Sequence, residues 1–410
     1  MGGAGAAYRL SRAGRAAAAV ALGGLWTGLM LLSLGGASCG HQYFLDGPEV
    51  TRTPRGSATP GPTGSPTPGL VFASNSADGT LSEFSRDPVA GALTLIGTVA
   101  AGAANGPTGL ALDPSNSFLY AANSADHLIR AFSIDSATGA LTAIGSADDG
   151  PASSPQRIAI DPTGSFLYVT NGAGASISQY TISGAGTLNA NGAFTANGVV
   201  VQPMGIAAAP GGDAVYVADF GSGRVLSLAI QADGSLALAG SVASLGPNGA
   251  GQPRGIAVDP SGDFVYVADS GNGTNGVVSV FAVGAGDILT YLASNPTAAQ
   301  TRATFDLALA GNAAGGALYL YATNGGLNTV SDFLVSTGVL SLQGSTGGLT
   351  APRGIGSDAN GNFVYVANGG TGQIFGYAVG AGGALSSIGA FNTERPANPA
   401  SAPAYLAIAQ

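Results

Sequence analysis

The chain has 410 residues, of which only 9% are charged and 68 are glycine, a composition typical of closely spaced turns and tight packing. Its formal net charge is −9, and all 13 basic residues are arginines, three of them within the first 15 positions. Nucleic-acid binding requires a basic face, and this composition excludes one.

The first 38 residues predict a targeting segment, because three arginines precede an apolar stretch over residues 16–37. The order basic, apolar, small and cysteine resembles a bacterial lipoprotein signal, with residues 36–39 (Gly-Ala-Ser-Cys) as the match and Cys39 as the lipidated residue. Cleavage near Ala37 without a lipid is one alternative. An uncleaved helix is another, since these 22 residues could span a bilayer. We therefore expect an extracytoplasmic protein, either a bacterial cell-envelope lipoprotein or a secreted protein, that touches a membrane only through its N-terminus.

Residues 39–69 are expected to form a tether. From Gly47 to Gly69 the chain consists largely of Thr, Pro, Gly and Ser, and such a segment cannot bury a core. It would hold the following domain, residues 70–410, clear of a membrane surface. A disordered spacer with no spatial role is equally consistent with this composition.

A six-residue phrase occurs seven times between Leu70 and the C-terminus. The copies start at Leu70, Phe118, Phe166, Ala214, Phe264, Tyr319 and Phe363. Successive starts are 48, 48, 48, 50, 55 and 44 residues apart. A repeat of about 40 to 50 residues built from short strands is typical of a propeller blade.

The phrase alternates so that a strand would be apolar on both faces. In the fifth copy Phe264 and Tyr266 point to one face, whereas Val265 and Val267 point to the other. A strand buried on both faces belongs to a sheet that lies between two other sheets. This is the position of a blade between its neighbours in a propeller.

A second phrase precedes the first in most repeats, and its clearest copy is Pro253–Gly262 (PRGIAVDPSG). It predicts an innermost strand followed by a type I turn over Asp259–Gly262. Similar copies start at Pro107, Pro155, Pro203 and Pro352, and a degenerate one runs from Thr304 to Leu309. Two outer strands, such as 277–283 and 288–293, would complete a four-stranded antiparallel blade.

The chain enters at the second strand of a blade and ends on an inner-strand phrase, Pro403–Ala409. We expect Tyr405–Ala409 to pair antiparallel with Val71–Asn75. This pairing would close the ring with three strands from one terminus and one from the other, and would remove exposed sheet edges. The predicted fold is therefore an all-β, seven-bladed β-propeller of four-stranded antiparallel blades.

The phrases FLYVTN, FVYVAD and PRGIAVDPSG resemble the YVTN repeats of bacterial surface-layer propellers and the lactonase-type seven-bladed propellers, which include 6-phosphogluconolactonase and a muconate-lactonising enzyme. The resemblance covers residues 70–410. For a lactonase it implies a histidine two positions after the inner-strand proline. The seven positions here are Gly109, Arg157, Gly205, Gly255, Asp306, Gly354 and Tyr405, and none is histidine.

Residues near the start of the inner strands differ between repeats and would converge at one mouth of the channel. The candidate ligand-binding residues at these positions are Arg157, Arg254, Arg353, Phe305, Asp306 and Tyr405. Arginine binds carboxylates through forked hydrogen bonds, so the set would suit a carboxylate or a sugar acid. In the alternative, which the sequence favours, Arg254 and Arg353 pair with the Asp or Asn that ends each second strand, such as Asp219 and Asp269, and only stabilise the ring.

His127 is the only histidine of the repeat region and follows the second copy of the phrase. It is a further candidate ligand-binding residue and could serve as an acid or a base, although a histidine in such a turn is more often a surface residue. The Asn or Asp that ends each phrase is expected to accept the amides of its own turn. We therefore expect neither a metal nor a cofactor.

Two functions remain open after the sequence analysis. The first is an envelope-anchored or secreted, monomeric, non-catalytic propeller that binds a protein, a glycan or a small anion. The second is a lactonase-like hydrolase or lyase that acts on a sugar-acid lactone or carboxylate at the arginine-containing mouth. The missing histidine favours the first.

Overall fold

The structure is a computed structural model that describes residues 69–104, 106–150, 153–196, 198–245, 249, 251–271, 276–296, 304–311, 316–393 and 402–409. The signal segment, Cys39 and the tether up to residue 68 lie outside these ranges, and so the expectations about them stay predictions. Within the ranges no helix has the length and apolar character needed to cross a membrane.

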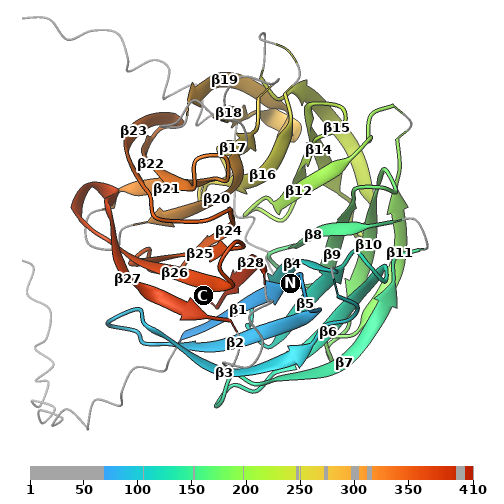
Figure 1. Ribbon diagram of the computed structural model, residues 1–410. Coiled ribbons are helices and arrows are strands. Elements are labelled where there is room, and N and C mark those ends of the chain that lie inside the picture. The colour runs from blue at the N-terminus through green and yellow to red at the C-terminus, as the bar shows by residue number, and fades with distance from the viewer. Residues whose placement is uncertain are drawn as a thin grey trace, which may run out of the picture. The chain divides into compact units, whose positions relative to one another are not determined.

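The described residues form seven four-stranded antiparallel sheets arranged in a ring (Figure 1). Blades 1 to 4 are, from the inside outward, β28 (Pro403–Ile408), β1 (Gly69–Asn75), β2 (Thr80–Arg86), β3 (Leu93–Ala100); β4 (Pro107–Leu112), β5 (Phe118–Asn123), β6 (Leu128–Ile134), β7 (Leu141–Asp148); β8 (Pro155–Ile160), β9 (Phe166–Asn171), β10 (Ser176–Ile182), β11 (Leu188–Phe194); and β12 (Pro203–Ala208), β13 (Ala214–Asp219), β14 (Arg224–Ile230), β15 (Leu236–Ala243).

Blades 5 to 7 follow the same order. They are β16 (Pro253–Val258), β17 (Phe264–Asp269), β18 (Val277–Val283), β19 (Leu289–Pro296); β20 (Thr304–Gly311), β21 (Leu318–Asn324), β22 (Thr329–Ser336), β23 (Val339–Thr346); and β24 (Pro352–Ser357), β25 (Phe363–Asn368), β26 (Gln373–Val379), β27 (Leu385–Asn392). The helical elements of the described chain are two 3-10 turns, η2 (Ala285–Asp287) and η3 (Ala381–Gly383). The all-β, seven-bladed fold expected from the repeats is confirmed.

The ring closes by the pairing of the two chain ends that the sequence predicts. Strand β28 pairs antiparallel with β1, and Val71 lies opposite Ile408 and Ser74 opposite Tyr405. The amide of Ala409 also donates to the carbonyl of Leu70, at 2.9 Å. Figure 1 shows both ends of the described chain in this one blade.

The second strand of each blade is buried on both faces, as its alternation predicts. Val265 and Val267 of β17 pack with Tyr216 of blade 4, whereas Tyr266 packs with Leu320 of blade 6. Odd and even residues of one strand thus contact opposite neighbours. Apolar burial of this kind contributes about 25 cal/mol per Å² and supplies most of the cohesion of the ring.

The tyrosine of the phrase also joins each of several blades to the next by a hydrogen bond. Its hydroxyl donates to a glycine carbonyl in the loop between the third and fourth strands of the following blade. The pairs are Tyr120 with Gly186 (2.9 Å), Tyr168 with Gly234 (2.9 Å), Tyr321 with Gly383 (2.8 Å) and Tyr365 with Gly91 (2.6 Å). Burial raises the pKa of these tyrosines, so they remain protonated donors.

Strand boundaries depart from the sequence prediction in blades 5 and 6. The outer strand expected over 288–293 is β19, Leu289–Pro296, because a 3-10 turn occupies the preceding residues. The degenerate inner strand expected to end at Leu309 continues to Gly311 as β20. The loop between β22 and β23 contains only Thr337 and Gly338, both with positive φ (47° and 76°).

Replacing Tyr168 with Phe tests the tyrosine–glycine contact. The substitution removes the donor to Gly234 and leaves a buried carbonyl without its partner, so we expect the free energy of unfolding to fall by about 1 to 2 kcal/mol. Urea unfolding measures this loss. The matched control is Tyr266→Phe, because the Tyr266 hydroxyl has no hydrogen-bond partner among the described residues and its removal should cost far less. Equal losses in the two variants would contradict the assignment.

Candidate functional site

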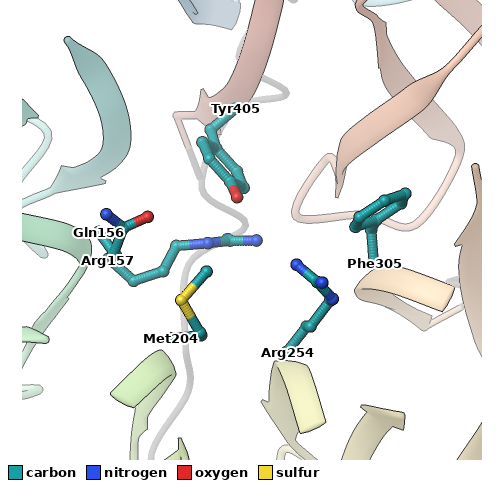
Figure 2. A pocket seen from close by; sticks show the side chains of 6 residues that line it. All are labelled: Gln156, Arg157, Met204, Arg254, Phe305 and Tyr405. Carbon is teal, nitrogen blue, oxygen red and sulfur yellow. The ribbon is translucent and has the colours of Figure 1, made fainter. Parts of the chain in front are cut away.

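The inner strands begin at one end of the channel. The side chains at the second position of five of them form its mouth, defined here as Gln156, Met204, Arg254, Phe305 and Arg353. Figure 2 shows four of these side chains pointing toward one another from different blades, together with Arg157 and Tyr405. Hydroxyl groups in the phrase of the preceding blade help to fix the backbone here. Thr170 donates to the carbonyl of Met204 at 3.0 Å, and Thr323 donates to that of Arg353 at 2.7 Å.

One residue further along, the inner strands of neighbouring blades approach so closely that four of the seven positions hold glycine. A Cβ atom at Gly205 would lie 2.1 Å from the carbonyl oxygen of Arg254, and one at Gly354 would lie 2.6 Å from that of Ala404. The other two glycines are Gly109 and Gly255. The three remaining positions carry Arg157, Asp306 and Tyr405, and we call these three residues the channel plug.

The channel plug residues contact one another across the axis. Arg157 forms an ion pair with Asp306 at 3.0 Å, and its guanidinium carbon lies 3.7 Å from the centroid of the Tyr405 ring. Burial alone would lower the pKa of Arg157, but the neighbouring Asp306 and Tyr405 outweigh it and raise this pKa. Asp306 also accepts the amide of Ile355, at 3.4 Å. The three plug residues therefore satisfy one another beneath the mouth.

Arg254 lies above the plug and has no such carboxylate. Its guanidinium lies 4.6 Å from the ring centroid of Phe220 and 5.2 Å from that of Phe305, and its Nε donates to the Ser270 hydroxyl at 3.1 Å. Burial lowers the pKa of Arg254, and the positive charge of Arg353 lowers it further against an opposing effect of Tyr405. Among the described residues no carboxylate lies within ion-pair distance of Arg254.

The ion pairs that the sequence favoured for Arg254 and Arg353 are absent from the described part of the chain, so that interpretation was wrong for these two residues. Asp219 accepts the amides of Val201 and Gln202 at 2.7 and 2.8 Å. Asp269 likewise accepts backbone amides, including that of Gly271 at 2.7 Å. These amides occupy both oxygens of Asp219 and one oxygen of Asp269, so they hold the two carboxylates at the loops of their own blades instead of at a guanidinium.

Arg353 is exposed at the mouth and has no hydrogen-bond or ion-pair partner among the described residues. Together with Arg254 it leaves two positive charges without a counter-charge in that part of the chain. The space enclosed by the six residues of Figure 2 is about 20 Å³. A ligand would therefore contact the guanidinium groups from outside instead of entering the channel.

His127 lies in the turn between β5 and β6 and does not line this space. Its φ is 60°, and its Nδ1 accepts the amide of Ser154 at 3.3 Å. Asn328 has the equivalent place in blade 6, with φ of 61°, and its side-chain oxygen accepts the amide of Ala351 at 2.8 Å. The histidine therefore fills a structural position with a left-handed conformation, and its ring nitrogen satisfies an amide of the neighbouring loop.

The strand-end Asn and Asp residues are buried, and Asn123, Asp219 and Asp269 accept amides of their own turns as expected. The side-chain oxygens of Asn75 and Asn171 instead have no hydrogen-bond partner among the described residues. Asn123 accepts the amide of Ala125 at 3.0 Å, and Asn171 donates to Ser178 at 2.8 Å. In the described ranges no group of three or more potential metal ligands occurs.

Four contacts of the mouth escaped the sequence analysis as binding residues, namely Gln156, Met204, Phe220 and Ser270. Gln156 and Met204 stand one position after an inner-strand proline, so the phrase offered a signal for them. Phe220 and Ser270 directly follow the strand ends Asp219 and Asp269, and their position in the repeat was the available signal.

Stability measurements on Arg157→Met and Arg254→Met test which arginine is structural. Arg157→Met leaves the buried Asp306 without its partner, so we expect a loss of about 3 kcal/mol in the free energy of unfolding. Arg254→Met removes a partly buried charge that has no counter-charge in the described chain, so stability should stay equal or rise. Chemical denaturation of both variants gives the comparison. A larger loss in Arg254→Met would refute this division of roles.

Comparison with known protein families supports the fold. The model of the family described as "Lactonase, 7-bladed beta-propeller" matches residues 65–153 and 150–272. A comparison with curated protein sequences finds no match.

Solved structures resemble the ring over most of its length. A candidate 6-phosphogluconolactonase from Bacteroides fragilis is 20% identical with a TM-score of 0.71, and the alignment covers 85% of this chain and 100% of that one. The periplasmic gluconolactonase PpgL of Pseudomonas aeruginosa is 20% identical with a TM-score of 0.66, and the alignment covers 84% and 99%. A protein from Lactobacillus plantarum is 20% identical with a TM-score of 0.69, and the alignment covers 84% and 100%. At these identities the likeness concerns the fold.

Proposed function

Because the chain belongs to the lactonase family of seven-bladed β-propellers, we propose that it binds a small sugar acid or sugar-acid lactone at the channel mouth. The observation that carries the proposal is the pair Arg254 and Arg353, which has no carboxylate partner in the described chain. In a protein of net charge −9, two such guanidinium groups, whose charges repel each other at one mouth, favour an anion as their partner.

The surroundings of Arg254 suit this role. The rings of Phe220 and Phe305 flank the guanidinium and shield it from water, which strengthens its attraction for a carboxylate. Burial is the main cause of the lowered pKa of Arg254, and an anion at the mouth would offset both this burial and the smaller repulsion by Arg353. Binding and neutralisation of the two arginines would therefore be coupled.

Binding without turnover is the form of the proposal that the side chains favour, as in a non-catalytic envelope propeller. Hydrolysis of a lactone requires water to lose a proton as it attacks the carbonyl carbon, and the ring oxygen to leave with a proton. The one carboxylate of the mouth and plug, Asp306, is already held by Arg157. No histidine lines the space shown in Figure 2.

Lactone hydrolysis is the second candidate, favoured by membership of the lactonase family and by the fold shared with the Pseudomonas gluconolactonase. In such a reaction Arg254 would stabilise the negative charge that develops on the carbonyl oxygen. Water would then supply and receive the protons without a dedicated side chain, so turnover would rise with pH as hydroxide becomes available.

Ligand binding by Arg254→Ala tests both candidates. Gluconate binding, measured by calorimetry, should weaken at least about tenfold because a charge-assisted contact is lost. Gluconolactone opening above its spontaneous rate should be undetectable in the parent protein if the role is binding alone. His127→Asn is the control, since it keeps the acceptor for Ser154, and it should leave gluconate binding unchanged.

Unchanged gluconate affinity in Arg254→Ala would contradict the binding site. Lactone turnover in the parent protein that disappears in Arg254→Ala, with the fold intact, would replace the binding role with the hydrolase.

We further propose that the propeller works outside the cytoplasm, carried by Cys39 on a membrane or secreted after cleavage. Mass spectrometry of the mature N-terminus is the measurement. A lipid-modified Cys39 as first residue is expected. A mature chain that retains residues 1–38, or an unmodified Cys39, would refute the lipid anchor.

A further inference from the structure

Gln156 is the second residue of β8 and one of the six residues that line the space at the mouth (Figure 2). Its side chain is half-buried. Its Nε2 donates to both the carbonyl and the hydroxyl of Ser154, each at 3.1 Å. A carbonyl oxygen only accepts hydrogen bonds, so the atom of Gln156 that faces Ser154 is the amide nitrogen. The Oε1 of Gln156 therefore points away from Ser154.

Neighbouring residues hold the amide group of Gln156 in this orientation. The hydroxyl of Thr108, in the inner strand of the preceding blade, donates to the carbonyl of Pro155 at 2.9 Å and fixes the backbone. The amide of Gly172 donates to the carbonyl of Ser154 at 3.1 Å and fixes the acceptor. A Cβ atom at Gly172 would lie 3.3 Å from Cγ of Gln156, so the side chain packs against this glycine. The amide group is thus preorganised, and a ligand that contacts it loses little affinity to ordering of the side chain.

The Oε1 of Gln156 is an accessible acceptor at the mouth. It accepts no hydrogen bond within the described part of the chain, and it is not among the buried atoms that lack a partner. Figure 2 shows this oxygen on the side of Arg157 and Tyr405. The two arginines that line the space only donate hydrogen bonds, and Met204 and Phe305 offer no strong hydrogen-bonding group. The acceptors of this lining are therefore Oε1 of Gln156 and the Tyr405 hydroxyl.

We propose that Gln156 determines specificity at the mouth by accepting a hydrogen bond from a hydroxyl group of the bound acid. This role rests on the function proposed above, in which the carboxylate of the ligand binds Arg254. Gln156 and Arg254 line one space of about 20 Å³, so a single small ligand at its opening reaches both. A hydroxy acid satisfies the guanidinium and the amide oxygen together, whereas an acid without a hydroxyl satisfies only the guanidinium. A site built to accept a hydroxyl rejects the analogue that lacks it, so the mouth selects hydroxy acids such as aldonates.

Calorimetric titration of gluconate and hexanoate into the purified protein tests this role of Gln156. The two ligands have equal numbers of carbons and one carboxylate each, but only gluconate has hydroxyl groups. Hexanoate should bind the parent protein more weakly than gluconate. In Gln156→Met the affinity for gluconate should fall about fivefold, because one neutral hydrogen bond is lost, and the affinity for hexanoate should not fall. Arg254→Ala should weaken both ligands, because they share the carboxylate.

Gln343→Met is the matched control. Gln343 is exposed on β23, the outermost strand of blade 6, and its Nε2 likewise donates to a main-chain carbonyl, that of Ser341 at 2.9 Å. This variant should leave both affinities unchanged. Gln156→Ala is a second variant without the amide and should show the same selective loss as Gln156→Met. Urea unfolding of each variant verifies the fold.

Unchanged gluconate affinity in both Gln156 variants would overturn the specificity role. An equal loss for the two ligands, or equal affinity for them in the parent protein, would overturn it as well. The function proposed for the mouth survives these outcomes as long as Arg254→Ala weakens gluconate binding. Gluconate that fails to bind the parent protein, or that binds Arg254→Ala equally well, would instead remove the proposed function and the role of Gln156 together.

Discussion

The rest of the ring depends on the burial of each blade's second strand between its two neighbours, and in four blades a tyrosine of that strand donates to a glycine carbonyl of the next blade. The contact works because the second strand of each blade is buried on both faces, which places this hydroxyl where it must find a partner within the protein. The same burial obliges the outer loop of the next blade to approach closely. A Cβ at Gly234 would lie 2.1 Å from the Phe166 ring, so aromatic residue and glycine are required together. In blade 6 the loop has only two residues, and Gly338 still packs on the ring of Phe264, although the Tyr266 hydroxyl has no hydrogen-bond partner among the described residues.

Most of the ring was predictable from the sequence, because the evidence was repeated seven times. Alternation in a phrase such as that of Phe264 showed burial on both faces, and the phase of the chain ends predicted the pairing of β28 with β1. The local departures from the predicted strand boundaries were harder to predict from the sequence. The residues around Thr337 do not predict a two-residue turn, because the φ of 47° at Thr337 depends on how the flanking strands β22 and β23 pair.

The candidate site was only partly predictable, since its contacts join blades that are not neighbours. The sequence placed Arg157, Asp306 and Tyr405 at one level of the channel but could not say that they would bind one another across it. It also assigned Asp219 to an arginine, although backbone amides within hydrogen-bond range satisfy that carboxylate first. In the folded protein several donors compete for each carboxylate, and the outcome decides which charges remain unpaired. Arg157 binds Asp306, whereas Arg254 has no carboxylate partner among the described residues.

The glycines below the mouth have a geometric consequence. Around the ring, side chain and glycine alternate at this level, so that each large residue faces a neighbour without a Cβ. Seven is odd, and strict alternation cannot return to its starting point. The mismatch falls at Gly205 and Gly255, which are adjacent. Because the number of blades is odd, one sector of the nearly symmetric ring differs from the rest, and this sector carries Met204 and Arg254.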